Sequence, residues 1–339
     1  MALSKGSKGF LAVLALLVGL TGAGLWMLRG PTGLASPHGG ETIVIVVPEG
    51  AGVSMIGDLL ERQGIIRSST VFNILARLDG RLIQAGEYEV ALGSGLEAVL
   101  DVLAAGPAPP PTFTVTIPEG LTVEQTLERI VEADGSPFTI GQLRQALEGV
   151  AVPDWVPVTF LPEDAQPFEG LLFPNTYEFR LDASPPDVLE RLVAQTDRVL
   201  SAMASSTGLD FYETLILASL VEREARLADE RSRISAVIHN RLEEGVRLQI
   251  DATVLYALGE QRDRVLRADL EVDSLWNTYL HDGLPPTPIA GVGEASIRAA
   301  AQPADEDYLY YVVDPETGRH RFSRTFAEHQ RAIAEVRAG

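Results

Sequence analysis

The chain lacks cysteine altogether, and basic residues are few. Without cysteine in its 339 residues there can be no disulfide, no thiolate nucleophile and no Cys-based zinc or iron-sulfur site. The 27 lysines and arginines stand against 47 acidic residues, which gives a formal charge of −20. Such a surface repels phosphate groups, so nucleic acid is excluded as a partner. The 46% hydrophobic content also excludes a largely disordered chain and is enough for more than one folded domain.

Several common catalytic motifs are absent as well. The sequence has no Gly-x-Ser-x-Gly elbow, no Walker loop and no His-Glu-x-x-His. Its five histidines are scattered, so a metal site would need ligands from distant segments. We therefore expect no metal and no cofactor, and a reaction that depends on carboxyl groups.

The first forty residues predict a membrane anchor. Residues 9–28 carry no charge, and a helix of that length, at about 1.5 Å per residue, spans a bilayer core. Lys5 and Lys8 precede this run, and no acidic residue occurs before Glu41, so residues 1–8 are expected in the cytoplasm. A linker, 29–40, would then lead to an extracytoplasmic body of a single-pass protein of the cell membrane. A signal peptide cleaved near Ala35 remains an alternative, and it too exports the body.

A repeat of about seventy residues follows the linker. Residues 42–47 (TIVIVV) predict a strand that ends in Pro-Glu-Gly at 48–50. Residues 113–117 (FTVTI) predict another strand, which ends in Pro-Glu-Gly at 118–120. An amphipathic helix follows each turn, so the repeated unit is strand, turn and helix.

The repeat indicates small αβ modules. We expect one module at 41–111, LysM-like in sequence shape, which either holds the cell-wall polymer or serves only as a spacer. A Pro-rich run at 106–111 ends it, and the second copy, at 112–135, would open a mainly helical catalytic domain at 112–339. The predicted fold class is α+β, with an N-terminal membrane helix and few, short strands.

Local signals place the remaining elements. Ser184, Asp210 and Thr325 each precede a helical pattern as N-cap residues, the last two with a glutamate three positions on. Residues 308–313 and 319–323 flank a turn at 314–318, and this arrangement predicts a β-hairpin. Further elements are expected as helices at 71–78, 95–105, 215–225 and 234–242 and as a strand at 88–92.

Two glutamates in the segment LASLVERE, residues 217–224, are candidate catalytic groups. On a helix, Glu222 and Glu224 point to different faces, and the small side chains beside Glu222 leave room for a polymer. The alternative is that both acids only form ion pairs with nearby arginines, namely Arg223, Arg226 and Arg231. Spacing alone does not decide between these interpretations.

Ordered motifs along the chain provide a resemblance. They are EGLLFP at 169–174 with TY at 176–177, LASLVERE at 217–224, NRL at 240–242, RLQ at 247–249 with Asp251 and Thr253, WNTY at 276–279, GLPP at 283–286 with PI at 288–289, and His320 with Phe322 before Glu328 and His329. In this order the motifs resemble the endolytic murein transglycosylase, or YceG-like, family.

The resemblance implies a function and a catalytic residue. It implies that Glu222 is catalytic, that the active domain is extracytoplasmic, and that the protein ends nascent peptidoglycan strands near the membrane, with peptidoglycan synthases as possible partners. Substrate-holding roles are expected for six residues: Glu169, Gln249, Asp251, Thr253, Asn277 and Tyr279. A capping role for Glu169 and Asn277, and local loop support by Asp251 and Thr253, remain open.

The implied reaction cleaves the β-1,4 bond between N-acetylmuramic acid and N-acetylglucosamine without water. Glu222 would protonate the leaving oxygen and then accept the proton of the muramic C6 hydroxyl, which yields a 1,6-anhydro end. One alternative is a peptidoglycan hydrolase with Asp251 as its second carboxylate. Another is a non-catalytic wall-binding or divisome scaffold protein.

Overall fold

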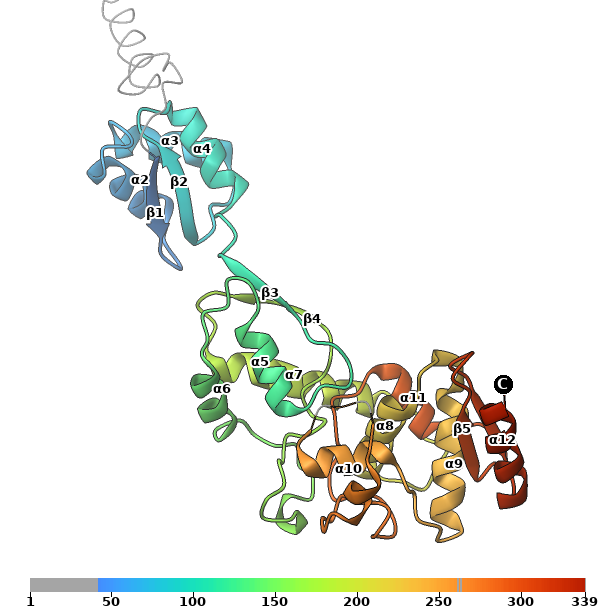
Figure 1. Ribbon diagram of the computed structural model, residues 1–339. Helices are drawn as coiled ribbons and strands as arrows, with labels where there is room; N and C mark the ends of the chain where they lie inside the picture. The colour runs from blue at the N-terminus through green and yellow to red at the C-terminus, as the bar shows by residue number, and fades with distance from the viewer. Residues whose placement is uncertain (1–41, 261, 263, 339) are drawn as a thin grey trace, which may run out of the picture. The chain divides into compact units, whose positions relative to one another are not determined.

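The computed structural model describes residues 42–260, 262 and 264–338. The expected cytoplasmic residues 1–8, membrane helix 9–28 and linker 29–40 lie outside them. Within the described part of the chain, no helix is both long and apolar enough to cross a membrane. The chain divides into two compact units, one that ends at Pro110 and one that begins at Pro111 (Figure 1).

The described part of the N-terminal unit, residues 42–110, packs three helices on a two-stranded antiparallel sheet. Its elements are β1 (Thr42–Val47), α2 (Val53–Arg62), α3 (Ser69–Asp79), β2 (Gly86–Ala91) and α4 (Leu96–Ala105). Ile45 of β1 lies opposite Tyr88 of β2, and both are buried under the helices. Because side chains alternate across a strand, the neighbouring Val44 and Val46 point outward and are exposed.

The C-terminal unit opens with the same order of elements. These are β3 (Thr112–Thr116), α5 (Val123–Val131), α6 (Ile140–Leu147), β4 (Thr176–Arg180) and α7 (Pro185–Ser201). β3 and β4 are antiparallel, with Val115 opposite Tyr177. The repeat is therefore longer than the predicted strand, turn and helix. Its second copy holds a long segment, 148–175, between α6 and β4, whereas only residues 80–85 join α3 to β2.

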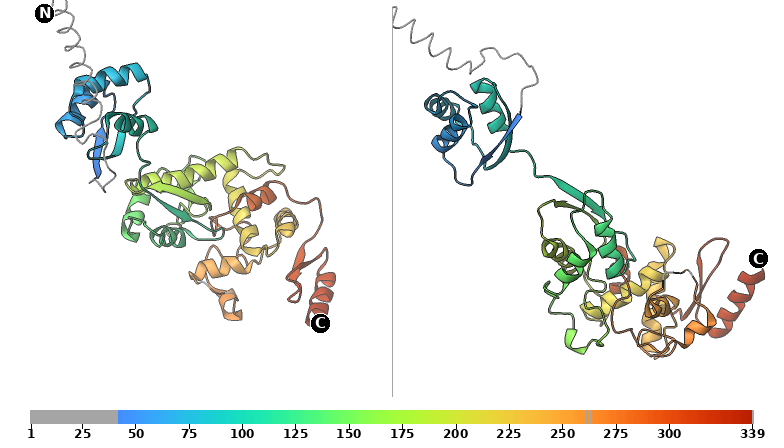
Figure 2. Two further views of the ribbon diagram at one scale, coloured as in Figure 1. Left: turned by 90° about the horizontal axis from the view of Figure 1, so that it is seen from above. Right: turned by 60° about the vertical axis from the view of Figure 1, so that its left-hand side comes forward.

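The rest of this unit is mainly helical. It comprises α8 (Phe211–Glu224), α9 (Arg231–Glu243), α10 (Asp251–Leu258), α11 (Glu294–Ala301), β5 (Tyr310–Val313), β6 (His320–Ser323) and α12 (Phe326–Ala338), with 3-10 turns η1 (Val158–Phe160), η2 (Ala228–Glu230) and η3 (Arg267–Glu271). α8 packs against both α9 and α11, and α12 packs on the β5–β6 hairpin (Figure 2).

The local predictions are confirmed by these elements. Ser184 and Asp210 each accept the backbone N–H three positions on, as N-caps of α7 and α8. Thr325 and Glu328 form the predicted capping box before α12. β5 and β6 form the predicted hairpin. The described residues thus have the expected mixture of helices with few, short strands.

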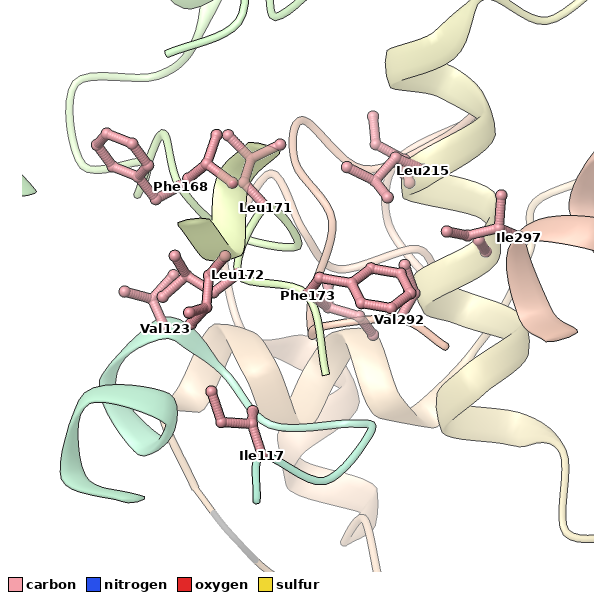
Figure 3. Packing of buried hydrophobic residues seen from close by; sticks show 14 of the residues in the cluster. Ile117, Val123, Phe168, Leu171, Leu172, Phe173, Leu215, Val292 and Ile297 are labelled. Atoms are coloured by element: carbon pink, nitrogen blue, oxygen red, sulfur yellow. The ribbon is translucent and has the colours of Figure 1, made fainter. Parts of the chain in front are cut away.

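One hydrophobic core holds the opening of the C-terminal unit against its helices. Ile117 and Val123 lie on either side of the second Pro-Glu-Gly turn and belong to this core. In Figure 3, Val123 lies beside Leu172, and Phe173 and Val292 lie between this side of the core and Leu215 of α8 and Ile297 of α11. This packing places the turn next to the end of α8.

Candidate active site

Glu222 lies in the last turn of α8 and is held at both carboxylate oxygens. Oε2 accepts the backbone N–H of Gly293 at 3.2 Å, and Oε1 lies 3.4 Å from Nη2 of Arg231. Gly293 is the N-cap of α11, so the positive end of that helix faces the carboxyl group. Only 7% of the Glu222 side chain is exposed, and it opens on a cavity of about 840 Å³, which we call the Glu222 cavity.

The partners of Glu222 are themselves fixed. Arg231 begins α9, and its Nε donates to Ser296 Oγ of α11 at 3.0 Å. The fully buried Ser219, one turn before Glu222, accepts the Ile289 N–H at 3.0 Å and donates to the Ile216 carbonyl. These bonds link α8, α9, α11 and the loop before α11, so the carboxyl group is oriented by the tertiary structure and not by its own helix alone.

Glu224 points elsewhere, as the helical spacing predicts. Its Oε2 accepts the hydroxyl of Tyr311 on β5 at 2.9 Å. Burial raises the pKa of Glu224 to about 7. Glu224 lines a second cavity of about 730 Å³, the Glu224 cavity. A raised pKa also makes this residue a candidate acid, although its hydroxyl partner ties it to the hairpin.

Three of the predicted substrate-holding residues line the Glu224 cavity: Gln249, Asp251 and Tyr279. The Tyr279 hydroxyl donates to Asp251 Oδ1 at 2.5 Å. Gln249 has a φ of 52°, a left-handed conformation that costs a non-glycine residue on the order of 1 kcal/mol. Its side chain is exposed beside the cavity. Backbone strain of this kind is more frequent at functional positions than elsewhere, so it supports a substrate-holding role for Gln249.

Glu119 was not predicted as a site residue. It comes from the second Pro-Glu-Gly turn, lines the Glu222 cavity, and has Oε2 3.8 Å from Nη2 of Arg231. Partial burial and the negative charge of Glu222 raise the pKa of Glu119, while Arg231 acts in the opposite direction. The repeated Pro-Glu-Gly turn is the signal for Glu119 in the sequence, but a repeat of strand, turn and helix by itself indicates only a structural unit.

In the described part of the chain, no group of three or more His, Asp and Glu side chains is arranged to hold a metal ion.

Comparison of the sequence with known proteins identifies the family to which the chain belongs. Residues 45–335 match the profile of the YceG-like family. The chain belongs to this family. It is 34% identical to the endolytic murein transglycosylase of Bacillus subtilis (strain 168) over 86% of this chain and 84% of that protein. It is 27% identical to the protein of the same name from Streptococcus pneumoniae serotype 2 (strain D39 / NCTC 7466), over 86% of this chain and 58% of that one.

A solved structure extends the likeness to the fold. A crystal structure of a putative YceG-like protein from Listeria monocytogenes superposes with a TM-score of 0.55 at 30% identity. The match covers 86% of this chain and 99% of that one. The YceG-like family is thus supported by sequence and by fold.

Glu169 of this YceG-like chain lines the Glu222 cavity but is engaged in the structure. Its Oε1 accepts the Val123 N–H in the first turn of α5 at 3.1 Å, and its Oε2 accepts the Tyr256 hydroxyl at 3.2 Å. The residue is 3% exposed, and burial raises the pKa of its carboxyl group to about 7. These contacts favour the capping role over substrate contact.

The last two predicted residues lie inside the fold. The Asn277 amide donates to the carbonyls of Leu270 and Val272, and its Oδ1 accepts the Tyr279 N–H. Thr253 donates to the Ile250 carbonyl, and its hydroxyl lies 2.9 Å from that of Thr278. Both are fully buried, and neither lines the Glu222 or the Glu224 cavity. Their hydrogen bonds shape the loops beside α10.

The two cavities of the YceG-like unit adjoin each other. They share four lining residues, Arg223, Ala252, Leu255 and Arg262. Glu222 lines one cavity and Asp251 the other. Asp251 is therefore not grouped with Glu222, whereas Glu119 is.

Proposed function

We propose that this protein is a lytic transglycosylase of peptidoglycan with Glu222 as its acid and base. The observation that carries the proposal is a carboxyl group that is 7% exposed, held at both oxygens, and open to a cavity large enough for sugar rings. The relatives named endolytic murein transglycosylase support the reaction and its endolytic character.

The geometry suits the first step. Protonated Glu222 gives its proton to the oxygen that links C1 of N-acetylmuramic acid to N-acetylglucosamine, and the C1–O bond breaks. The carboxylate left behind is then stabilised by Arg231 and by the Gly293 N–H at the positive end of α11. Both partners are in place beforehand, so little reorganisation accompanies the change of charge.

The same carboxylate then serves as base. The C6 hydroxyl of the muramic residue attacks C1, and its proton passes to Glu222, which regenerates the acid. The products are a 1,6-anhydro end and a free 4-hydroxyl, and water is neither consumed nor released. One carboxyl group is enough for this cycle, whereas a hydrolase needs a second one to activate water or to form a glycosyl intermediate.

The test compares two glutamates of one helix. Glu222→Gln keeps the shape of the side chain but removes its titratable proton, so release of anhydro-muropeptides should fall at least about 100-fold. Glu224→Gln, which faces the hairpin, is the matched control and should retain most activity. Products are identified by mass spectrometry, since an anhydro end is one water lighter than a reducing end.

Two results would overturn the proposal. One is near-parental release of anhydro ends by folded Glu222→Gln. The other is loss of activity in a folded Glu224→Gln protein. Products with reducing ends would instead support a hydrolase, and intact strands would support a wall-binding scaffold.

A second part of the proposal concerns location. We propose that residues 9–28 anchor the protein in the cell membrane with residues 1–8 in the cytoplasm, and that the body acts outside, where nascent strands and their synthases are found. The uncharged run and the flanking Lys5 and Lys8 support this orientation. Full-length protein should stay with membranes at alkaline pH, and external protease should digest its body. A mature form that begins near Ser36 would contradict the anchor.

The third part concerns the N-terminal unit. We propose that this LysM-like module holds peptidoglycan for the catalytic unit, which begins at the second copy of the repeat. Its separate core and its exposed apolar side chains, Val44, Val46, Ile74 and Leu78 among them, support a binding role. Deletion of residues 41–111 should weaken binding to isolated peptidoglycan and lower turnover. Unchanged binding and turnover would make the module a spacer.

A further inference from the structure

The two Pro-Glu-Gly turns of the repeat differ in their surroundings. In the first copy, Pro48, Glu49 and Gly50 are all exposed. In the second copy, Glu119 lies beside Arg231 and Glu222 in the Glu222 cavity. Pro118 and Glu119 of the second turn are exposed as well, but Glu119 and Gly120 line the Glu222 cavity, whereas no residue of the first turn lines it.

The second turn is fastened to the site by backbone bonds. Gly120 N–H donates to the Gly291 carbonyl at 2.8 Å, and Gly291 N–H donates to the Leu121 carbonyl at 2.7 Å. Arg223 of α8 also donates to the Gly120 carbonyl at 3.0 Å. These bonds hold the turn against both the catalytic helix and the loop before α11.

The Glu119 carboxyl group rests against Gly293, the residue whose N–H holds Glu222. A Cβ added at Gly293 would overlap the Glu119 carboxyl group. The backbone of Gly293 is extended, with φ −77° and ψ 159°, and suits any residue. A larger residue at position 293 would therefore be met by the Glu119 side chain and not by the backbone, and it would displace the Glu119 carboxyl group from its place beside Glu222.

We propose that Glu119 is a positioning residue that sets the charge of Glu222 during the reaction by sharing Arg231 with it. This inference rests on the proposed function. Arg231 is 3.4 Å from Glu222 and 3.8 Å from Glu119, so one cation faces two carboxyl groups. With both groups ionised, the trio carries one excess negative charge, which uptake of a single proton removes.

The two carboxyl groups have two neighbours in common. Both face the guanidinium of Arg231, and the Glu119 carboxyl group also lies against Gly293, whose N–H holds Glu222. Partial burial and the negative charge of Glu222 raise the pKa of Glu119. The other charged groups that line the cavity are Glu124, Glu128, Glu169, Glu260, Arg223 and Arg262.

The role of Glu119 follows from the first step, which needs Glu222 protonated. If Glu119 lost its charge, Arg231 would pair with Glu222 alone and would favour the ionised form. The proton donor would then be depleted as the pH rises, sooner than in the parent enzyme. Glu119 thus acts on the proton donor through Arg231, the cation that faces both carboxyl groups.

The experiment is a pH–rate profile of anhydro-muropeptide release by the full-length protein in detergent. Glu119→Gln should move the alkaline limb of the profile down by about one pH unit, with a roughly tenfold loss of rate on that limb and near-parental rates at acidic pH. Glu49→Gln removes the equivalent charge from the first copy of the repeat and should leave the profile unchanged.

A second variant tests the contact without changing any charge. Gly293→Ala keeps the N–H that holds Glu222 but displaces the Glu119 carboxyl group, so it should shift the limb in the same direction. Gly52→Ala is its matched control. Gly52 caps α2 with the same φ of −77° and ψ of 159°, and a Cβ there meets nothing within 4 Å.

The outcomes separate this inference from the proposed function. A Glu119→Gln profile that overlies the parent's, or a loss that is uniform at every pH and accompanied by a lower melting temperature, would refute the role of Glu119. In either case an inactive Glu222→Gln protein leaves the proposed function standing. Full activity in Glu222→Gln would refute the proposed function itself.

Discussion

Replacement of Glu169 by glutamine should make the protein relatively more stable as the pH rises. The pKa of this 3% exposed carboxyl group is raised from its ordinary 4.5 to about 7 by burial. Below pH 4.5 it is protonated both in the folded and in the unfolded chain. Between pH 4.5 and 7 only the unfolded chain loses the proton, so the folded state loses stability across this window.

The size of the effect follows from the shift in pKa. Each unit corresponds to 1.36 kcal/mol, so the folded state should lose about 3 kcal/mol from this group by pH 8. Glutamine does not titrate and can still accept the Val123 N–H at the start of α5. The free energy of unfolding of Glu169→Gln, relative to the parent, should therefore rise by about 3 kcal/mol from pH 4 to pH 8.

The assay is urea unfolding of the parent and the variant across this pH range. Trp155 and Trp276, which both lie in the C-terminal unit, report its unfolding by fluorescence. Taking the difference between the two proteins cancels the other titrating groups, Glu224 included. Glu49→Gln, at an exposed position, controls for the general loss of one charge.

A pH-independent difference in stability would refute the reasoning, because it would mean that the Glu169 carboxyl group remains well solvated in the folded chain. A relative loss of stability as the pH rises would refute it more strongly. A large loss of activity in a stable variant would return Glu169 to the substrate-holding residues.

Three further substitutions test neighbouring parts of the site. Ser219→Ala leaves the buried Ile289 N–H without its acceptor and should cost about 1–3 kcal/mol in urea unfolding; an unchanged midpoint would contradict this. Tyr311→Phe removes the donor to Glu224 and should lower stability by a similar amount, measured in the same way, while anhydro-muropeptide release persists. Gln249→Gly relieves the left-handed backbone, so its melting temperature should not fall; reduced turnover at unchanged stability would then assign a substrate role to the side chain.

The local elements and the two candidate acids can be predicted from the amino-acid sequence. Capping boxes such as Asp210 with Glu213, and the hairpin around 314–318, depend on residues a few positions apart, so they can be identified without tertiary contacts. Helical periodicity alone also separates the faces of Glu222 and Glu224. The choice between these two glutamates needed the family motifs, because both are flanked by arginines at similar spacing.

The surroundings of Glu222 depend on contacts between segments that are far apart in the chain. The full extent of the repeat is not visible in the sequence. In the second copy the insertion at 148–175 places β4 much further along the chain from β3 than β2 is from β1 in the first copy. Glu119 and Gly293 reach Glu222 from segments 103 and 71 positions away along the chain. Asn277 resembles a substrate-holding residue in a motif, yet packing turns its amide inward onto backbone carbonyls. The local sequence pattern cannot predict where these three residues lie. Their positions depend on the core around Ile117, in which the second turn and the loop before α11 pack against α8.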